Sequence, residues 1–492
     1  MIDAGTALAE IRYGLGAILP EVYLLSLLVV LILLDVRGAS RRQAAWLCIG
    51  AQLGLLGWLL YQGPPAQPRP ALLGQVVQDA TGWYLRLVLT ASQLLTLFLT
   101  LQMAWPSGIR QRVTFFSLLV CLQLGLQVMV ISQHVLSLFV GMELASLCSY
   151  VLVSYFRTER AASEAGVKYL LYGAFSSGIM LFGFSLLYGL TGTLSLAPGE
   201  LDVLLQDVDT VPLLLALLFV FAGFAFKASL FPFHFWAPDA YEGGNWATAT
   251  LLATGSKVAA FGLILRWMQA LPPAGVWLQL LLALSAIAMV GGNIAAFTQT
   301  HVRRLMAYSG IAHAGLLLFA SLQPQLPALQ AALLLYLGYY VMMTGLAFLA
   351  GHTLARHSGQ AHYTHWGGLA RQQPVAVLGL AVALIALAGL PPTAGFMAKL
   401  RVFIPLWSWY QQGGSAWVGL TLGIAVLSTV LGVFYYLKPL IWVLLRPSTT
   451  TAAADGHDEP LAKRPAPLLG FVLLLLSLAL LLLGVYLPPI GG

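Results

Sequence analysis

Charged side chains are scarce in this sequence of 492 residues, making up 8% of it, whereas hydrophobic residues make up 59%. A water-soluble chain of this length would form several domains with about 25% charged residues, so the composition excludes a soluble fold. Apolar stretches of about 18 residues or more, each long enough to cross a hydrocarbon core of roughly 30 Å, recur along the chain. The sequence therefore predicts an all-α membrane protein.

Cysteine is also scarce, with Cys48, Cys121 and Cys148 all inside apolar stretches and without C-x-x-C spacing. This argues against a disulfide framework and gives no support to a zinc or iron–sulfur site. No dinucleotide-binding fingerprint is present, and no buried Ser/His/Asp set favours a membrane-embedded hydrolase. We therefore expect no metal and no cofactor on this chain.

We predict about fourteen transmembrane helices, which would place both termini on the same side of the membrane. Their approximate bounds are 18–35, 43–61, 80–103, 113–130, 133–155, 168–190, 211–228, 247–269, 276–297, 304–321, 328–353, 374–408, 417–442 and 466–488. Prolines around 211–245 and within 374–408 predict broken helices there. Spans 4–8 and 9–13, with five helices each, are expected to form two inverted repeats that each contain one broken helix.

These repeats define the predicted organisation of the chain. We expect the following segments: an N-terminal three-helix segment (1–110), a first repeat (111–270), a second repeat (271–445), a polar inner linker (446–465) and a C-terminal helix (466–492). Loops on one side hold fourteen basic residues, against Arg12, Arg69, Arg86 and Arg266 on the other. By the positive-inside rule, this bias places both termini on the outer side.

Lysine is the rarest basic residue, because only six of the 24 lysines and arginines are lysines. Five of these six lie in or at the edge of apolar spans, namely Lys168, Lys227, Lys257, Lys399 and Lys438. Arginine stays protonated, whereas a desolvated lysine can exchange a proton near neutral pH. The buried lysines are therefore candidate proton sites. For Lys168 and Lys438, which lie near the inner ends of their spans, snorkelling to the lipid headgroups is the ordinary alternative.

Prolines mark two of the lysine sites. Lys227 precedes Pro232 by five residues, and this proline removes the hydrogen-bond donor that the carbonyl of Ala228 would otherwise have. Pro391 and Pro392 break a second helix just before Lys399. Lys257 lies about ten residues into its span and cannot easily reach the headgroups. A lysine beside a helix break in the membrane is typical of an ion site.

Other groups could complete a proton path. Glu143 is the one carboxylate deep in a predicted span, which makes it the candidate counter-ion of Lys227. His234 and His313 also lie within spans and titrate near physiological pH, although a lone membrane histidine is often only a hydrogen-bonding core residue. We expect protons to pass from Lys227 to Lys257 and then laterally, through His313, to Lys399.

Six motifs in this chain resemble those of the antiporter-like membrane subunits of respiratory complex I, and most closely subunit N. They are GMELASLCSY with Glu143, ASEAGVKYLLYGAFSSG with Lys168, FKASLFPFHFWAPDAYEGG with Lys227 and His234, TGSKVAAF with Lys257, RRLMAYSGIAHAGLLL with His313, and GLPPTAGFMAKL with Lys399. One departure is the sequence EGGNWAT at 242–248, where the family usually has EGAPTPV. Both prolines of the usual motif are therefore absent from this turn.

The resemblance implies a proton-translocating subunit in a bacterial-type inner membrane, surrounded by other membrane subunits of NADH:quinone oxidoreductase. It also implies that NADH, flavin, iron–sulfur clusters and quinone bind to other subunits. Two alternatives stay open. The chain could belong to a multisubunit sodium/proton antiporter, which shares the lysine at the broken helix, or it could be a structural spacer that pumps nothing.

Overall fold

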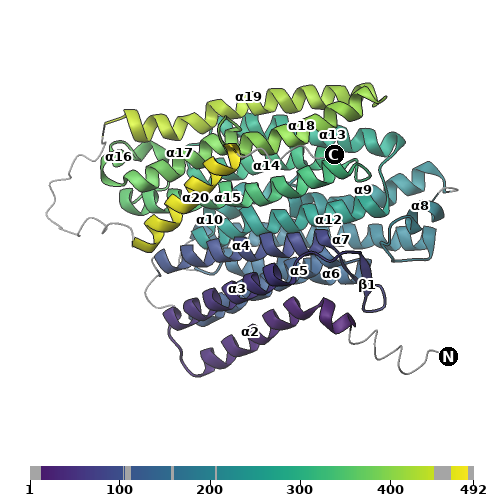
Figure 1. Ribbon diagram of the computed structural model, residues 1–492, viewed down its shortest axis with the longest axis horizontal. Coiled ribbons are helices and arrows are strands. Elements are labelled where there is room, and N and C mark those ends of the chain that lie inside the picture. Colours follow the sequence, from purple (N-terminus) through teal and green to yellow (C-terminus); the bar gives the residue numbers. More distant parts are fainter. Residues whose placement is uncertain are drawn as a thin grey trace. The chain divides into compact units, whose positions relative to one another are not determined.

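The computed structural model describes residues 13–103, 105, 112–156, 160–205, 208–447 and 467–485. The chain divides into two compact units, which comprise residues 1–281 with 321–325 and residues 282–320 with 326–492. Both units consist mainly of helices (Figure 1). Within the described residues, 12 helices are long and apolar enough to cross a membrane, so the chain is a multi-pass membrane protein.

The helices of the first unit follow the predicted spans closely. They are α2 (Leu19–Val36), α3 (Arg41–Gln62), α4 (Ala80–Gln102), α5 (Arg112–Ile131), α6 (Val135–Val153), α7 (Arg160–Thr191), α8 (Glu200–Leu204), α9 (Thr210–Ala228), α10 (Trp236–Gly243), α11 (Trp246–Leu251), the π-helical turn η1 (Leu252–Ser256) and α12 (Lys257–Ala270). Helix α5 packs along α6, and α7 packs along α9. Helices α6 and α7 also pack against each other, so these four helices form one bundle.

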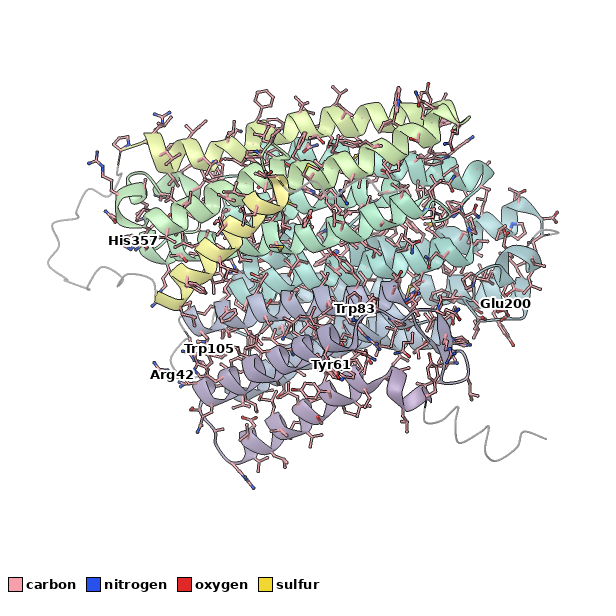
Figure 2. The ribbon with its side chains drawn as sticks, viewed as in Figure 1. Arg42, Tyr61, Trp83, Trp105, Glu200 and His357 are labelled. Carbon is pink, nitrogen blue, oxygen red and sulfur yellow. The ribbon has the colours of Figure 1, made fainter. Side chains whose placement is uncertain are left out.

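Loops at one end of this unit are tied together by backbone hydrogen bonds. Strands β1 (Arg69–Ala71) and β2 (Val76–Gln78) form an antiparallel hairpin. In the loop between α5 and α6, Ser132 pairs with Val76 of β2, and His134 pairs with Ser195 in the segment after α7. At the same end, Trp83 and Tyr61 mark the start of α4 and the end of α3 (Figure 2), and Trp83 Nε1 donates to the Leu59 carbonyl at 2.8 Å.

The second unit contains most of α13 and all the helices after it, except for the segment at 321–325. These elements are α13 (Gly275–Phe297), α14 (Val302–Ser321), α15 (Pro327–Ser358), the 3₁₀ turn η2 (Tyr363–His365), α16 (Leu369–Gln372), α17 (Pro374–Ala388), α18 (Ala394–Gln411), α19 (Ala416–Leu445) and α20 (Pro467–Val485). Helix α15 packs against α17 and α18, and α20 lies against α17, α18 and α15 (Figure 1).

Each of the fourteen predicted spans thus coincides with helical structure. Two of them, at 304–321 and 374–408, are not among the 12 apolar membrane-crossing helices. The second of these is divided into α17 and α18, as its prolines predicted. The predicted inner linker and both chain ends lie wholly or mostly outside the described residues.

Candidate functional site

Two helices end abruptly inside the apolar interior, and both end in the same way. Helix α9 ends before Ser229, which adopts a left-handed conformation, and the N–H of Leu230 reaches back to the carbonyl of Ala225 at 2.8 Å. Helix α17 ends before Gly389, also left-handed, and the N–H of Leu390 reaches back to Ile385 at 3.2 Å. Each end is therefore a C-terminal cap of the Schellman type.

A proline follows each cap at the same distance. Pro232 and Pro392 lie four residues after Ala228 and Ala388, the last residues of α9 and α17. A proline at this position provides no N–H for the carbonyl four residues earlier. Both carbonyls accept a hydrogen bond from a lysine instead. Lys257 Nζ donates to Ala228 at 3.1 Å, and Lys399 Nζ donates to Ala388 at 3.0 Å.

The prediction that Pro232 frees the carbonyl of Ala228 is therefore confirmed. The group that binds this carbonyl is the ammonium of Lys257, 29 residues further along the chain, and not that of Lys227. Lys257 directly follows the π-helical turn η1, and both Lys227 and Lys257 are buried in the first unit. One backbone carbonyl at the end of α9 thereby connects the surroundings of the two lysines.

Lys227 and Glu143 are linked to neighbouring hydroxyl groups. Lys227 is 1% exposed, and its Nζ donates to Ser146 Oγ at 3.1 Å. The Glu143 carboxylate accepts a hydrogen bond from Ser177 on α7. Glu143 and Ser146 are three residues apart on α6 and share a face of that helix. No direct Glu143–Lys227 ion pair is found among the described residues. Glu143, the expected counter-ion, instead lies about one helical turn from Ser146, which binds the ammonium of Lys227.

Lys168 and His234 are placed differently. Lys168 is half-exposed on α7 and forms ion pairs with Glu164 at 2.8 Å and with Asp239 at 3.3 Å. His234 lies between α9 and α10, where its ring packs against Phe235. Its Nδ1 is buried without a hydrogen-bond partner among the described residues. Neither residue forms a described hydrogen bond with Lys227 or Lys257.

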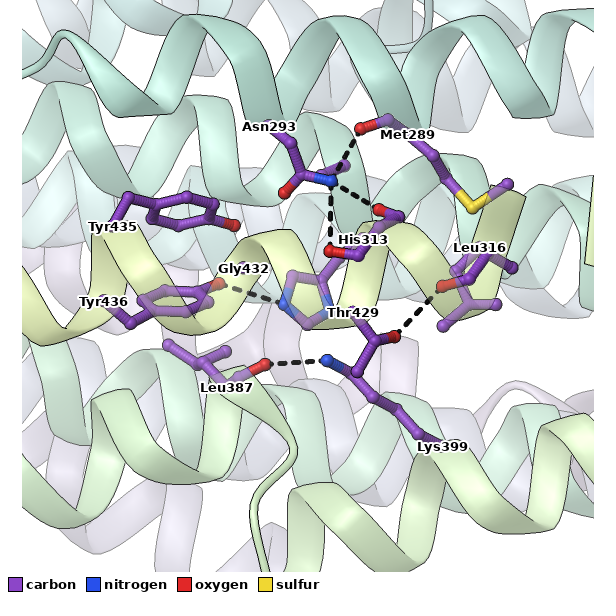
Figure 3. Close-up of a pocket in the computed structure, with 13 residues that line it drawn as sticks. Met289, Asn293, His313, Leu316, Leu387, Lys399, Thr429, Gly432, Tyr435 and Tyr436 are labelled. Carbon is purple, nitrogen blue, oxygen red and sulfur yellow. Dashed lines mark hydrogen bonds between the residues drawn. The ribbon is translucent and has the colours of Figure 1, made fainter. Parts of the chain in front are cut away.

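In the second unit, Lys399 and His313 share one small cavity (Figure 3). Its volume of about 20 Å³ is enough to hold one water molecule. Lys399 Nζ also donates to the Leu387 carbonyl at 3.0 Å, so two neutral acceptors hold its ammonium. No described carboxylate pairs with it.

Tyrosines surround His313, and they were not predicted from the sequence. The Nδ1 atom of His313 lies 2.7 Å from the Tyr336 hydroxyl, and Nε2 lies 3.1 Å from the Tyr436 hydroxyl. Tyr436 in turn shares a hydrogen bond with Ser309, one turn before His313 on α14. The chain has 19 tyrosines, and nothing in their spacing distinguishes these two, so only the fold reveals their contacts with His313.

Two buried ion pairs of the first unit were likewise not predicted. Arg86 binds Glu21 at 2.7 Å, and Arg266 forms two hydrogen bonds with Asp79 at 2.6 and 2.7 Å. Asp79 also caps α4 by accepting from the N–H of Gly82. The two residues of each pair are 65 and 187 residues apart in sequence, respectively. Arg86 and Arg266 therefore join distant parts of the chain and are structural residues rather than simple loop charges.

Comparison with known proteins identifies the family of this chain. The family described as NADH:quinone oxidoreductase/Mrp antiporter, TM, matches residues 132–431, more than half of the chain. NADH-quinone oxidoreductase subunit N from Chlorobium chlorochromatii (strain CaD3) is 34% identical over 468 residues, which cover 92% of this chain and 90% of the relative.

Two solved structures are similar over most of their length. A chain of respiratory complex I from Thermus thermophilus with bound aureothin has a TM-score of 0.77 and 29% identity, and the match covers 95% of this chain and 97% of that one. A chain of the Mrp complex from Dietzia sp. DQ12-45-1b has a TM-score of 0.80, with 96% and 94% covered, but its 20% identity shows the fold alone. The chain therefore belongs to the NADH:quinone oxidoreductase/Mrp antiporter family, as an antiporter-like membrane subunit of the subunit N type.

Proposed function

We propose that this chain is a proton-translocating membrane subunit of an NADH:quinone oxidoreductase, and that its buried lysines carry the protons. The observation that supports this most directly is the shared arrangement of the two helix breaks. At each break, the carbonyl just before the left-handed residue accepts a hydrogen bond from a lysine ammonium. Broken helices in membranes are typical of ion sites in transporters.

The chemistry of these contacts suits a proton that must move. A carbonyl oxygen stabilises an ammonium group but carries no full charge, so a lysine held by carbonyls can lose its proton without leaving an unpaired carboxylate behind. Arginine could not do the same, because its guanidinium stays protonated. This explains why lysines stand at the breaks, although most basic residues of the chain are arginines.

Within the first unit, the proposed transfer runs from Lys227 to Lys257. Ser146 holds its ammonium, and Glu143 acts on it from one turn away along α6. A weaker interaction with Glu143 would make the ammonium form of Lys227 less stable and favour transfer of its proton to Lys257. The ammonium of Lys257 binds the carbonyl of Ala228, the residue next to Lys227. Lys168, with its exposed ion pairs, and His234, in the first break, are proposed to lie towards the entrance of this path.

Within the second unit, the cavity that His313 and Lys399 share is the proposed second half of the path. Tyr336 and Tyr436 bind the two ring nitrogens of His313 and can relay a proton through their hydroxyl groups. Lateral transfer from Lys257 to His313, and release from Lys399 to the outside, stay predictions.

The same proposal includes the finer architecture. We expect α14 and the pair α17–α18 to cross the membrane as well, which gives fourteen spans with both termini outside. The five-helix repeats would be inverted within 111–270 and 271–445, flanked by the segments 1–110, 446–465 and 466–492. The membrane would be a bacterial-type inner membrane, and NADH, flavin, iron–sulfur clusters and quinone would bind to neighbouring subunits. The chain then contributes to translocation and carries no redox centre.

The proposal is tested by purifying the tagged chain from its native membranes and identifying the proteins that accompany it. We expect redox subunits and other antiporter-like subunits of complex I. Recovery with antiporter subunits alone would support the sodium/proton antiporter instead.

The assembled complex then allows a test of transport. Lys257→Met should leave assembly intact and lower proton uptake into vesicles, because methionine keeps the length of the side chain but cannot bind a proton. Lys438→Met is the matched control, since this half-buried lysine binds the Phe297 carbonyl outside the proposed path. Normal pumping by Lys257→Met would favour the spacer over the pump.

A further inference from the structure

One glycine of the C-terminal helix α20 lies against the backbone of the second helix break. A Cβ atom at Gly484 would lie 2.1 Å from the carbonyl oxygen of Pro392 and 2.3 Å from the carbonyl carbon of Thr393. Both distances are far below van der Waals contact, and both neighbours are backbone atoms that cannot rotate away. Only glycine fits at this position with α20 where it is.

This contact lies directly beside the Lys399 site. Thr393 is the N-cap residue of α18, the helix that carries Lys399 six residues later. On the other side of the break, a Cβ at Gly389 would lie 2.7 Å from Cδ of Lys399. The segment 389–393 therefore lies between α20 and the lysine, and a shift of this segment would change the positions of the carbonyls that hold the ammonium.

The two glycines of α20 differ in this respect. The buried face of this helix includes Leu469, Leu473, Leu476 and Leu480, spaced three to four residues apart, and Gly484 continues the same row. A Cβ atom at Gly470, on the same helix, would meet no described atom within 4 Å. The rest of this buried row thus consists of leucines, whereas the position against the break has room only for a glycine.

We propose that α20 is a positioning element of the Lys399 site, and that Gly484 sets its distance from the helix break. Helix α20 lies outside the part of the chain, residues 132–431, that the family model matches. The inference rests on the proposed function, since it assumes that Lys399 carries a transported proton. Gly484 itself takes no part in proton transfer.

The test compares Gly484→Val with Gly470→Val in the intact complex. Valine at 484 must push the break or α20 aside, whereas valine at 470 meets open space. We expect Gly484→Val to lower NADH-driven quinone reduction and pumping per assembled complex by about tenfold to a hundredfold, the effect of losing one hydrogen bond to a charged group. Gly470→Val should behave like the wild type.

A pH profile separates positioning from general damage. The titratable groups near Lys399 are His313 on α14 and Tyr435 and Tyr436 on α19. Tyr336 and Tyr340 on α15 contact His313 in turn. The described residues of α17 and α20 include no titratable group. Loss of carbonyl contacts makes the ammonium of Lys399 less stable, so the pH–rate profile of Gly484→Val should move to lower pH. A general packing defect would lower the rate without moving the profile.

The outcomes are distinct. Unchanged turnover and an unchanged profile in assembled Gly484→Val would overturn the inference. If Gly484→Val does not assemble, Gly484→Ala is judged by the same two measurements, with an unshifted profile again counting against the inference. Normal activity in Lys399→Met would instead refute the proposed function of the lysine itself.

Discussion

Replacing Lys227 with arginine separates a transported proton from a structural charge. The substitution keeps the positive charge and a donor for Ser146, so the subunit should fold and assemble. It should nevertheless lose most proton translocation, because a guanidinium does not release its proton. The measurement is acidification of vesicles that contain the purified complex, recorded per NADH oxidised.

The expected size of this effect follows from the surroundings of Lys227. The side chain is 1% exposed, so burial disfavours the charged form of lysine and arginine alike. Their intrinsic difference of about two to three pKa units then remains, which corresponds to about 3 to 4 kcal/mol. A step that requires the neutral side chain should therefore slow by at least about a hundredfold.

Lys438→Arg is the matched control for this substitution. Lys438 also lies in an apolar helix, where it binds the Phe297 carbonyl and its ammonium lies over the Phe297 ring. Arginine can make both interactions, so this variant should pump normally. Wild-type acidification in Lys227→Arg would refute the reasoning, because it would show that a residue unable to give up its proton serves equally well.

Three further substitutions test other parts of the chain. Glu143→Gln should lower proton pumping and quinone reduction together with assembly intact, and near-normal activity in membranes would end its role as counter-ion. Lys399→Met should impair turnover whereas Lys463→Met, in the predicted linker outside the described residues, should not; equal effects would point to a general charge requirement. Asp79→Asn should destabilise the subunit by about 3 to 5 kcal/mol, because it leaves Arg266 buried without its partner. Burial alone would raise the pKa of Asp79, but the hydrogen bonds and charge of Arg266 lower this pKa overall. The stability that the pair contributes is therefore present above about pH 4 and is lost as the pH falls further. If thermal unfolding showed no pH dependence in this range in either the wild type or Asp79→Asn, the result would contradict this prediction.

The helices were the part of this structure that the sequence could predict. Helices that cross lipid need long apolar runs, and such runs can be counted without knowing how they pack. The breaks were predictable for the same reason, since a proline acts on a carbonyl four residues earlier, whatever surrounds it. The start of α7 at Arg160, eight residues before the predicted span, was missed because polar residues at a helix end carry no apolar signal.

The partners of the lysines could not be predicted in this way. The contact between Lys257 and the Ala228 carbonyl joins residues on separate helices, and only their packing brings them together. The tyrosines beside His313 and the arginine–carboxylate pairs are likewise formed between distant parts of the chain. Residue type identified candidate proton sites, whereas the acceptors that hold each proton depend on tertiary structure.

The direction in which the Lys257 side chain points depends on the number of residues in the π-helical turn at 252–256. A π turn accommodates one residue more than an α-helical turn, and each residue of a helix rotates the next by about 100°. Deleting one residue from this turn would leave every side chain of the site present and would restore an uninterrupted helix. It would also rotate Lys257 by about a quarter of a circle relative to α11, away from the carbonyl of Ala228. The site therefore depends on an insertion that adds no chemical group of its own.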